Sequence, residues 1–169
     1  MVELKPVLAG DAQPLFALID KNRAYLRDWL PWLDTVLSLS DCEQFVAQLI
    51  KLEKVSMRKT FKICFQQRLA GIIDLREMTR NSAVVGYWLA ENQQGKGIAS
   101  DALLQLINRL KAEQQINRLV LRVESANLAS QKVALRCGFK LTERLTDAQR
   151  IYERLTDLLI FEQSWQTET

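Results

Sequence analysis

The sequence predicts a mixed α/β fold, in which helices flank a central mixed β-sheet. Two runs rich in β-branched and aromatic residues, residues 61–65 and 69–75, surround a short polar turn and indicate a hairpin. A strand–helix–strand pattern follows over residues 84–123. Two successive strands joined through a helix are typically parallel, so one parallel pair is expected to bracket that helix.

The N-terminal third is predicted to be helical. Asp11 stands where it can cap a helix with an apolar face. An aromatic segment, residues 25–33, comes next. Ser40 and Glu43 then have the spacing of a capping box at the start of a second amphipathic helix.

Strands and helices alternate in the C-terminal half. In chain order, we expect a strand over residues 84–90, a helix to about residue 113, a strand over 119–123, a short helix over 128–137, and closing strands from 139 onward and over 155–165. Gly138 follows the short helix at the position where glycine commonly ends helices, because it tolerates a left-handed backbone.

Length and composition restrict the class of protein. The chain has 169 residues, of which 48% are hydrophobic and 25% charged, values typical of a single globular domain over residues 1–169. A net charge of +3 helps to attract an anionic ligand but does not indicate nucleic-acid binding. The sequence contains neither an apolar run long enough to span a membrane nor a signal-peptide core, which predicts a cytoplasmic protein without a membrane partner.

Histidine is absent from the sequence. Its absence excludes Ser-His-Asp and Cys-His catalysis and every His-ligated metal site, so carboxylates, hydroxyls, thiols, lysines or water must carry any acid–base chemistry. Cys42, Cys64 and Cys137 are scattered and odd in number, a pattern that predicts reduced thiols in a cytosol and no metal site.

The most informative motif is Gln-Gly-Lys-Gly-Ile-Ala at residues 94–99, between an expected strand and an expected helix. Glycines let the backbone approach a ligand closely, and the free N–H groups of a first helical turn favour an anion. A P-loop fails because glycine follows Gly-Lys, and a dinucleotide fingerprint fails because Ser100 replaces its third glycine. An acyl-CoA turn of the pattern Gln/Arg-x-x-Gly-x-Gly/Ala is matched by Gln94, Gly97 and Ala99.

With this turn the chain resembles the GNAT superfamily of N-acetyltransferases. A second block carries the same resemblance: Asn127 at the end of a strand, a short helix with Ser130, and then Gly138-Phe139. The resemblance runs from about residue 84 to 161. In the N-terminal third, the segment over residues 22–32 looks like the Rim-type branch, the ribosomal-protein N-terminal acetyltransferases. The resemblance implies the GNAT fold and acetyl-CoA as the donor.

The resemblance also implies where CoA binds. The N–H groups of the glycine turn would hold the pyrophosphate, and the helix dipole would add to the attraction. Pantetheine would pair as an extra half-strand where the strand diverges from its neighbour near Val123, with Asn127 helping to hold it. The expected cofactor-binding residues are Trp88, Leu89, Ala90, Gln94, Gly95, Lys96, Gly97, Ile98, Ala99, Ser100, Asn127 and Ser130.

The implied chemistry is direct attack of an amine on the thioester, without a covalent enzyme intermediate. A backbone N–H near Leu89 would stabilise the oxyanion. Many superfamily members place a tyrosine four residues before the Gly-Phe, where this chain has Ala134. The Rim-type branch instead has serine where Ser130 stands, which predicts Ser130 as thiolate partner and proton donor. The alternative is that Ser130 only caps or packs its helix.

The general base is left open. The Rim-type branch often has a glutamate where this chain has Gln149, and other members have one where Val84 stands. Glu77, Glu91 and Glu124 remain, each expected to be a solvated surface carboxylate, and ordered water is a fourth option. At pH 7 about one α-amine in six is neutral, against about one lysine in 2,500. A missing strong base therefore favours an N-terminal amine.

The acceptor is predicted from the aromatic segment. By the resemblance, Tyr25, Trp29 and Trp32 bind a protein N-terminal amine, that of a ribosomal protein; a hydrophobic staple is the alternative for these side chains. Arg23 and Arg27 share a helical face that is either solvated or reads an acidic acceptor. Two other functions stay open: a small-molecule N-acetyltransferase for a polyamine, amino sugar or antibiotic, and a non-catalytic CoA-binding module. The resemblance also allows a homodimer.

Overall fold

The structure is a computed structural model that describes residues 1–168. The strands of this range are β1 (Val2–Pro6), β2 (Lys59–Phe65), β3 (Arg68–Arg76), β4 (Ser82–Leu89), β5 (Arg118–Glu124), β6 (Lys140–Ile151) and β7 (Arg154–Ser164). The helices are α1 (Ala12–Lys21), α2 (Arg23–Leu26), α3 (Leu39–Lys54), α4 (Ile98–Glu113) and α5 (Leu128–Arg136), with 3-10 turns η1 (Ala9–Asp11), η2 (Pro31–Thr35) and η3 (Glu91–Gln93).

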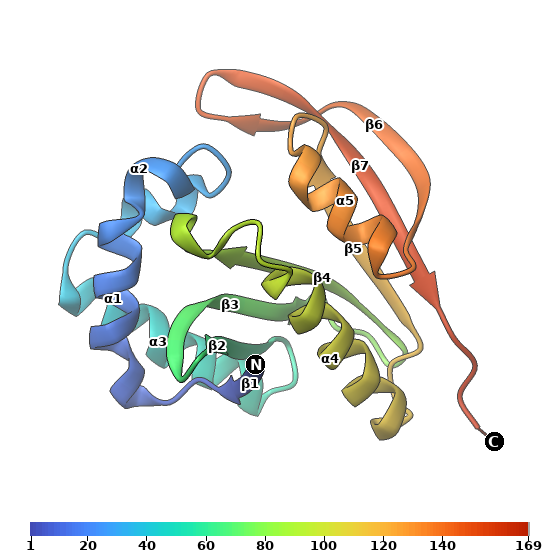
Figure 1. The fold of residues 1–169 in the computed structure, drawn as a ribbon, viewed down its shortest axis with the longest axis horizontal. Helices are drawn as coiled ribbons and strands as arrows, with labels where there is room; N and C mark the ends of the chain where they lie inside the picture. Colours follow the sequence, from blue (N-terminus) through green and yellow to red (C-terminus); the bar gives the residue numbers. More distant parts are fainter. Residues whose placement is uncertain (169) are drawn as a thin grey trace.

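These strands form one mixed sheet in the order β1-β2-β3-β4-β5-β7-β6. Strands β4 and β5 are parallel and bracket α4, whereas the other neighbouring pairs are antiparallel. The predicted mixed α/β fold with its hairpin and its parallel pair is therefore confirmed (Figure 1).

Helices cover both faces of the sheet. Ile72 and Trp88 pack with α1, α2, η2 and α3, whereas the next residues along the chain, Ile73 and Leu89, pack with α4 and α5. Consecutive side chains of a strand point to opposite faces. The N-terminal helices therefore lie on one face and α4 and α5 on the other, while the β6–β7 hairpin extends past both layers (Figure 1).

The N-terminus differs from the prediction. Residues expected to precede a helix form β1, which pairs with β2 and buries Val2 and Leu4. Two inward side chains are too few to reveal a strand by periodicity. Asp11 stands just before α1 as predicted, but its carboxylate accepts a hydrogen bond from the Leu8 N–H at 2.7 Å and pairs with Lys62 at 2.7 Å instead of capping α1.

The predicted capping box at the start of α3 is wrong by two residues. Ser38 is the N-cap, and its hydroxyl accepts a hydrogen bond from the Asp41 N–H at 3.1 Å. Asp41 reaches back to the Ser38 N–H at 3.1 Å. The sequence carries two overlapping candidates, and the short Asp41 side chain substitutes for the glutamate at Glu43 that the motif normally uses.

Strands β4 and β5 pair only over their first halves. Their register runs from Ser82 opposite Arg118 to Val85 opposite Leu121. Beyond that point β4 continues to Leu89 while β5 continues to Glu124 without pairing to it. The predicted divergence is thus present, and it opens the sheet at the carboxyl ends of the parallel strands.

Gly71 permits a close approach of β3 to β4, which predicts a large cost for any side chain there. A Cβ at Gly71 would lie 2.0 Å from the Trp88 carbonyl oxygen, which is backbone of a paired strand. Gly71→Ala should lower the free energy of unfolding by about 1–3 kcal/mol, measured by urea titration. Gly10→Ala is the control, since nothing lies within 4 Å of its Cβ. Equal stability of the two variants would contradict the explanation.

Candidate active site

A cavity of about 430 Å³ opens where β4 and β5 separate. Its walls come from the segment between α2 and η2, from both diverging strands, from the start of α5 and from the β6–β7 hairpin. Its lining includes Trp29, Trp32, Tyr87, Glu124, Asn127 and Ser130. Of the predicted site residues, this cavity therefore brings together the two tryptophans, Asn127 and Ser130.

A second cavity of about 230 Å³ lies at the glycine turn. Its walls combine Leu89 at the end of β4, the turn itself, the first residues of α4 and one face of α5. The predicted cofactor residues on its lining are Leu89, Gln94, Gly95, Gly97, Ile98, Ala99 and Ser100.

The glycine turn has the backbone of an anion cradle. Gly95 and Gly97 have φ angles of 73° and 76°, a left-handed region that disfavours residues with a Cβ. The first hydrogen bond of α4 runs from the Asp101 N–H to the Gly97 carbonyl at 3.0 Å. The N–H groups of the three residues before Asp101 thus precede the helical ladder, and the 16-residue helix adds its dipole.

The positive side chains beside this cradle come from α5. Lys132 and Arg136 line the cavity, and Arg136 donates to the Ser100 hydroxyl at 3.2 Å. Lys96, the predicted charge, is exposed and donates to the Gln93 side chain at 3.2 Å; it is not among the lining residues. Sequence reasoning missed Lys132 and Arg136, although their spacing of four places them on one helical face.

The strand residues of the predicted CoA site have different surroundings. Trp88 packs into the apolar cluster beneath α1 and α3. The Ala90 N–H donates to the Ala70 carbonyl at 2.8 Å, so it is already engaged within the fold. Leu89 reaches the second cavity, and its carbonyl accepts a hydrogen bond from the Gln94 side chain at 3.3 Å.

Ser130 is held between a helix cap and a tyrosine. The Asn127 side chain is the N-cap of α5 and accepts from the Ser130 N–H at 3.2 Å. The Tyr87 hydroxyl donates to the Ser130 Oγ at 3.1 Å. Burial raises the pKa of Tyr87 to about 12, so this donor stays protonated at neutral pH. Because Ser130 accepts from Tyr87, its own proton is free for a group in the cavity.

Sequence reasoning missed the contact between Tyr87 and Ser130. The two residues are 43 positions apart and belong to a strand and a helix. Their contact depends on how α5 packs against the end of β4, for which the sequence has no local signal. Of the alternative that Ser130 only caps or packs its helix, the capping part is wrong, because Asn127 is the N-cap of α5.

Two of the three candidate bases are exposed, as expected. Glu77 forms a two-pronged ion pair with Arg122 at 2.7 and 2.8 Å. Hydrogen bonding from Arg122 lowers the pKa of Glu77, which makes it a weaker proton acceptor. Glu91 is exposed after the end of β4, and its backbone N–H donates to the Asn22 side chain at 2.9 Å.

The third candidate, Glu124, contradicts the expectation of a solvated carboxylate. Its side chain is only 5% exposed, although it ends strand β5 beside the cavity. Burial raises the pKa of Glu124, and the Arg154 guanidinium partly offsets this effect. Glu124 pairs with Leu158 of β7 and lies beside Arg154, and contacts with residues about thirty positions away have no local sequence signal.

The tryptophans fit both interpretations that the sequence left open. Trp29 and Trp32 line the larger cavity, and the Trp32 ring also stacks on Phe45 with centroids 5.1 Å apart. The Trp32 side chain therefore packs against α3 and also forms part of the cavity wall. Tyr25 packs against the cluster under α1 and α3 and is not among the lining residues.

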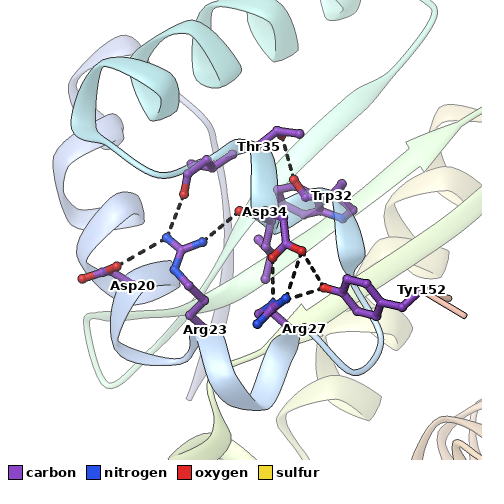
Figure 2. Close-up of polar contacts among 9 residues, drawn as sticks. Asp20, Arg23, Arg27, Trp32, Asp34, Thr35 and Tyr152 are labelled. Atoms are coloured by element: carbon purple, nitrogen blue, oxygen red, sulfur yellow. Dashed lines mark hydrogen bonds and ion pairs between the residues drawn. The ribbon is translucent and has the colours of Figure 1, made fainter.

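Arg23 and Arg27 are occupied by structural contacts (Figure 2). Arg23 donates to the carbonyls of Leu33 at 2.8 Å and Val36 at 2.7 Å, which fastens η2 to α2. Arg27 pairs with Asp34 at 2.7 Å. Both guanidinium groups are therefore engaged within the fold, and neither residue is among those that line the larger cavity.

The same cluster reaches the β6–β7 hairpin. The Tyr152 hydroxyl donates to Asp34 at 2.9 Å and accepts from Arg27 at 3.2 Å (Figure 2). Hydrogen bonds from Tyr152 and Arg27 lower the pKa of Asp34. These contacts tie the hairpin tip to the segment that carries the two tryptophans, so the larger cavity is bounded on both sides of the strand opening.

The cysteines lie in the interior of the fold. Cys42, Cys64 and Cys137 are free and buried, and burial raises the pKa of Cys137 and, to about 11, that of Cys42. Within residues 1–168, no group of three or more carboxylates or cysteines is arranged to hold a metal ion. No helix in the described range is long and apolar enough to cross a membrane.

The separated parallel pair, the glycine turn with open backbone N–H groups and the serine hydroxyl in the opening fit the class of acyl-CoA-dependent transferases. The family model for the acetyltransferase (GNAT) domain matches residues 2–140. The chain belongs to this family and is an acetyl-CoA-dependent N-acetyltransferase.

Individual relatives agree with this assignment. The ribosomal-protein-serine acetyltransferase of Escherichia coli (strain K12) is 33% identical over 95% of this chain and 90% of its own length. Two solved structures each have a TM-score of 0.93. The microcin C7 self-immunity acetyltransferase MccE, in complex with acetyl-CoA and AMP, is 27% identical over 97% of this chain and 92% of its own. RimL, a ribosomal α-N-protein acetyltransferase in complex with coenzyme A, is 28% identical over 96% and 93%.

The contacts of Arg23 predict a structural role for this residue. Arg23→Ala removes the donor to two backbone carbonyls and should lower the free energy of unfolding by about 1–3 kcal/mol in urea titrations. Lys21→Ala removes an exposed cation of the preceding helix and should change it by less than about 0.5 kcal/mol. If Arg23→Ala instead kept full stability and selectively lost acidic acceptor peptides, the acceptor-reading hypothesis would be right.

Proposed function

We propose that this protein transfers acetyl from acetyl-CoA to the N-terminal α-amine of a ribosomal protein. The observation that carries the proposal is the 33% identity, over nearly the whole chain, to a ribosomal-protein-serine acetyltransferase. The relative RimL, whose acceptor is a ribosomal α-amine, supports the same acceptor class. Such an acceptor would place the enzyme in the cytoplasm.

The geometry of the glycine-turn cavity supports its role as the CoA site. The left-handed glycines and the open first turn of α4 fit a pyrophosphate, and Lys132 and Arg136 supply positive charge. Pantetheine would follow the unpaired edge of β4 toward Asn127 and Ser130, which line the larger cavity. The thioester would then lie at the opening between the strands, between the two cavities.

Ser130 is the proton donor to the leaving thiolate in this proposal. Tyr87 keeps the Ser130 hydroxyl polarised and directs the serine proton away from itself. A hydroxyl that donates to a developing thiolate stabilises it in the transition state. Residues Trp29 and Trp32 form the apolar wall on the side from which the acceptor enters.

A small-molecule acceptor is the second candidate. The likeness to the self-immunity acetyltransferase MccE supports it, because that 27% identical structure holds the small molecule AMP together with acetyl-CoA. A polyamine, an amino sugar or an antibiotic would enter the same cavity between the tryptophans. The third alternative, a non-catalytic CoA-binding module, disagrees with the assignment of the chain to the acetyltransferase family.

An acceptor panel separates these functions. Steady release of CoA thiol is measured with a peptide that begins with serine, the same peptide blocked at its N-terminus but carrying a lysine, spermine and an aminoglycoside. We expect the free N-terminus to react fastest, because α-amines are neutral far more often than lysines near pH 7. Faster acetylation of lysine or of a small amine would overturn the ribosomal-protein proposal, and CoA binding without any thiol release would indicate the binding module.

Substitution of Ser130 and Tyr87 tests the proton donor. Ser130→Ala should lower kcat by about a hundredfold while CoA affinity, measured by calorimetry, changes little. Tyr87→Phe should lower kcat roughly tenfold, the scale of one hydrogen bond. Because Tyr87 acts through Ser130, adding Tyr87→Phe to Ser130→Ala should cause little further loss. Additive effects in the double variant would contradict this coupling.

A further inference from the structure

Glu124 is an ionisable side chain placed where an acceptor amine would arrive. It ends β5 at the strand opening and shares the cavity lining with Ser130 and Trp29. The carboxylate is buried, with 5% of its side chain exposed. A buried carboxylate on the wall of a cavity attracts a cationic ligand, because its burial limits the screening of its charge by water.

The two oxygens of Glu124 are incompletely satisfied. Oε1 lies 3.1 Å from the Arg154 guanidinium. Neither oxygen has a hydrogen-bond donor in good geometry among residues 1–168. An acid group in this condition can accept hydrogen bonds from an incoming ammonium, which has three N–H donors.

Arg154 is held by several partners and so presents one guanidinium edge to Glu124. It donates to the Asp28 carbonyl at 3.0 Å, and its guanidinium carbon lies 5.9 Å from the Trp29 ring centroid. Tyr152, at the tip of the same hairpin, is tied to Asp34 and Arg27 (Figure 2). The hairpin thus sets both the burial and the counter-charge of Glu124.

We propose that Glu124 binds the acceptor ammonium and takes its proton as the general base of the reaction, and that Arg154 is the positioning residue that keeps this carboxylate ionised and oriented. The proposal rests on the proposed amine acetylation and deepens it, because it assigns a residue to the proton that must leave the acceptor. It also explains how the site works without glutamate at Gln149 or Val84.

In the proposed reaction, every proton that leaves one group is taken up by another. The ammonium gives one proton to Glu124 and becomes a neutral amine. Its lone pair forms the C–N bond at the thioester carbonyl carbon, and the C–S bond breaks as the intermediate collapses. As the intermediate collapses, Ser130 donates its hydroxyl proton to the departing thiolate. The nitrogen loses its second proton, which passes to Ser130 and restores the hydroxyl. Glu124 then releases its proton to solvent.

The other titratable and charged groups facing this cavity are engaged elsewhere. Glu77 and Arg122 neutralise each other in their two-pronged pair. Arg76 pairs with Asp74 at 3.1 Å, and the Tyr87 hydroxyl donates to Ser130. Asp28, on the facing loop, disfavours the charge on Glu124, whereas Arg154 favours it. Glu124 is therefore the carboxylate of the cavity best placed to accept a proton.

The test is the pH dependence of kcat, with saturating acetyl-CoA and with the amine from the acceptor panel that the wild type acetylates fastest. Glu124→Gln should lower kcat by about a hundredfold. It should also abolish the acid limb of the profile, which is the fall of kcat at low pH caused by protonation of Glu124. Folding and cofactor binding are checked by thermal melting and CoA calorimetry. Glu162→Gln is the matched control, since Glu162 is also a strand glutamate paired with an arginine, Arg118 at 2.6 Å, but does not line the cavity.

A second variant covers the case in which Glu124→Gln fails to fold. Arg154→Ala removes the cation that lowers the pKa of Glu124, so the acid limb of kcat should move to higher pH. A purely structural role of Arg154 would lower kcat without moving the limb.

The outcomes separate this inference from the proposed acceptor. A wild-type kcat and pH profile in Glu124→Gln, or an unmoved limb in Arg154→Ala, overturns the general-base assignment for any amine. If the panel instead selects a small amine and both variants behave as expected, the proposed ribosomal acceptor fails while the assignment of Glu124 stands.

Discussion

The separation of β4 from β5 is the constraint on which the rest of the structure depends. After Val85 and Leu121 the two parallel strands stop pairing, so backbone groups at the centre of a sheet are left open. Unpaired backbone groups are costly unless a ligand or water satisfies them. The helices that follow these two strands, α4 and α5, start at the same opening and direct their N-termini toward it. One interruption in a ladder thus creates the cradle, the cavity and the position of Ser130.

The β6–β7 hairpin completes what the strand separation begins. A splayed pair alone would expose Glu124 to water on one side. The hairpin crosses to η2, where Tyr152, Arg27 and Asp34 share hydrogen bonds between exposed partners (Figure 2). Each such contact is weak in water. Together, these three contacts and the hydrogen bond from Arg154 to the Asp28 carbonyl hold the hairpin tip against the segment between α2 and η2. The properties of the acceptor side therefore depend on contacts far from the cofactor turn.

The sequence predicted those parts of the molecule whose signals are local. The glycine turn, the parallel pair around α4 and the cap by Gly138 each combine residue type with short spacing, and the structure contains all of them. Strand β1 was missed because five residues carry too little periodicity. In the site, Asn127 and Ser130 are only three residues apart in the sequence, so both could be predicted from one motif. The pairs of Tyr87 with Ser130 and of Glu124 with Arg154 form only through tertiary packing, so no pattern along the chain indicated them.

The burial of Glu124, where a solvated carboxylate was expected, has an energetic cost. Leaving a buried acceptor unsatisfied costs about 1–3 kcal/mol, and more when it is charged. A single nearby arginine rarely compensates the desolvation of a carboxylate, so such a pair contributes little to stability. Within the described residues, Glu77 after β3 and Glu162 in β7 avoid this cost by ion pairs near the surface with Arg122 and Arg118. In the proposed mechanism, the acceptor ammonium is the cation that completes the hydrogen bonds of this buried, incompletely paired carboxylate.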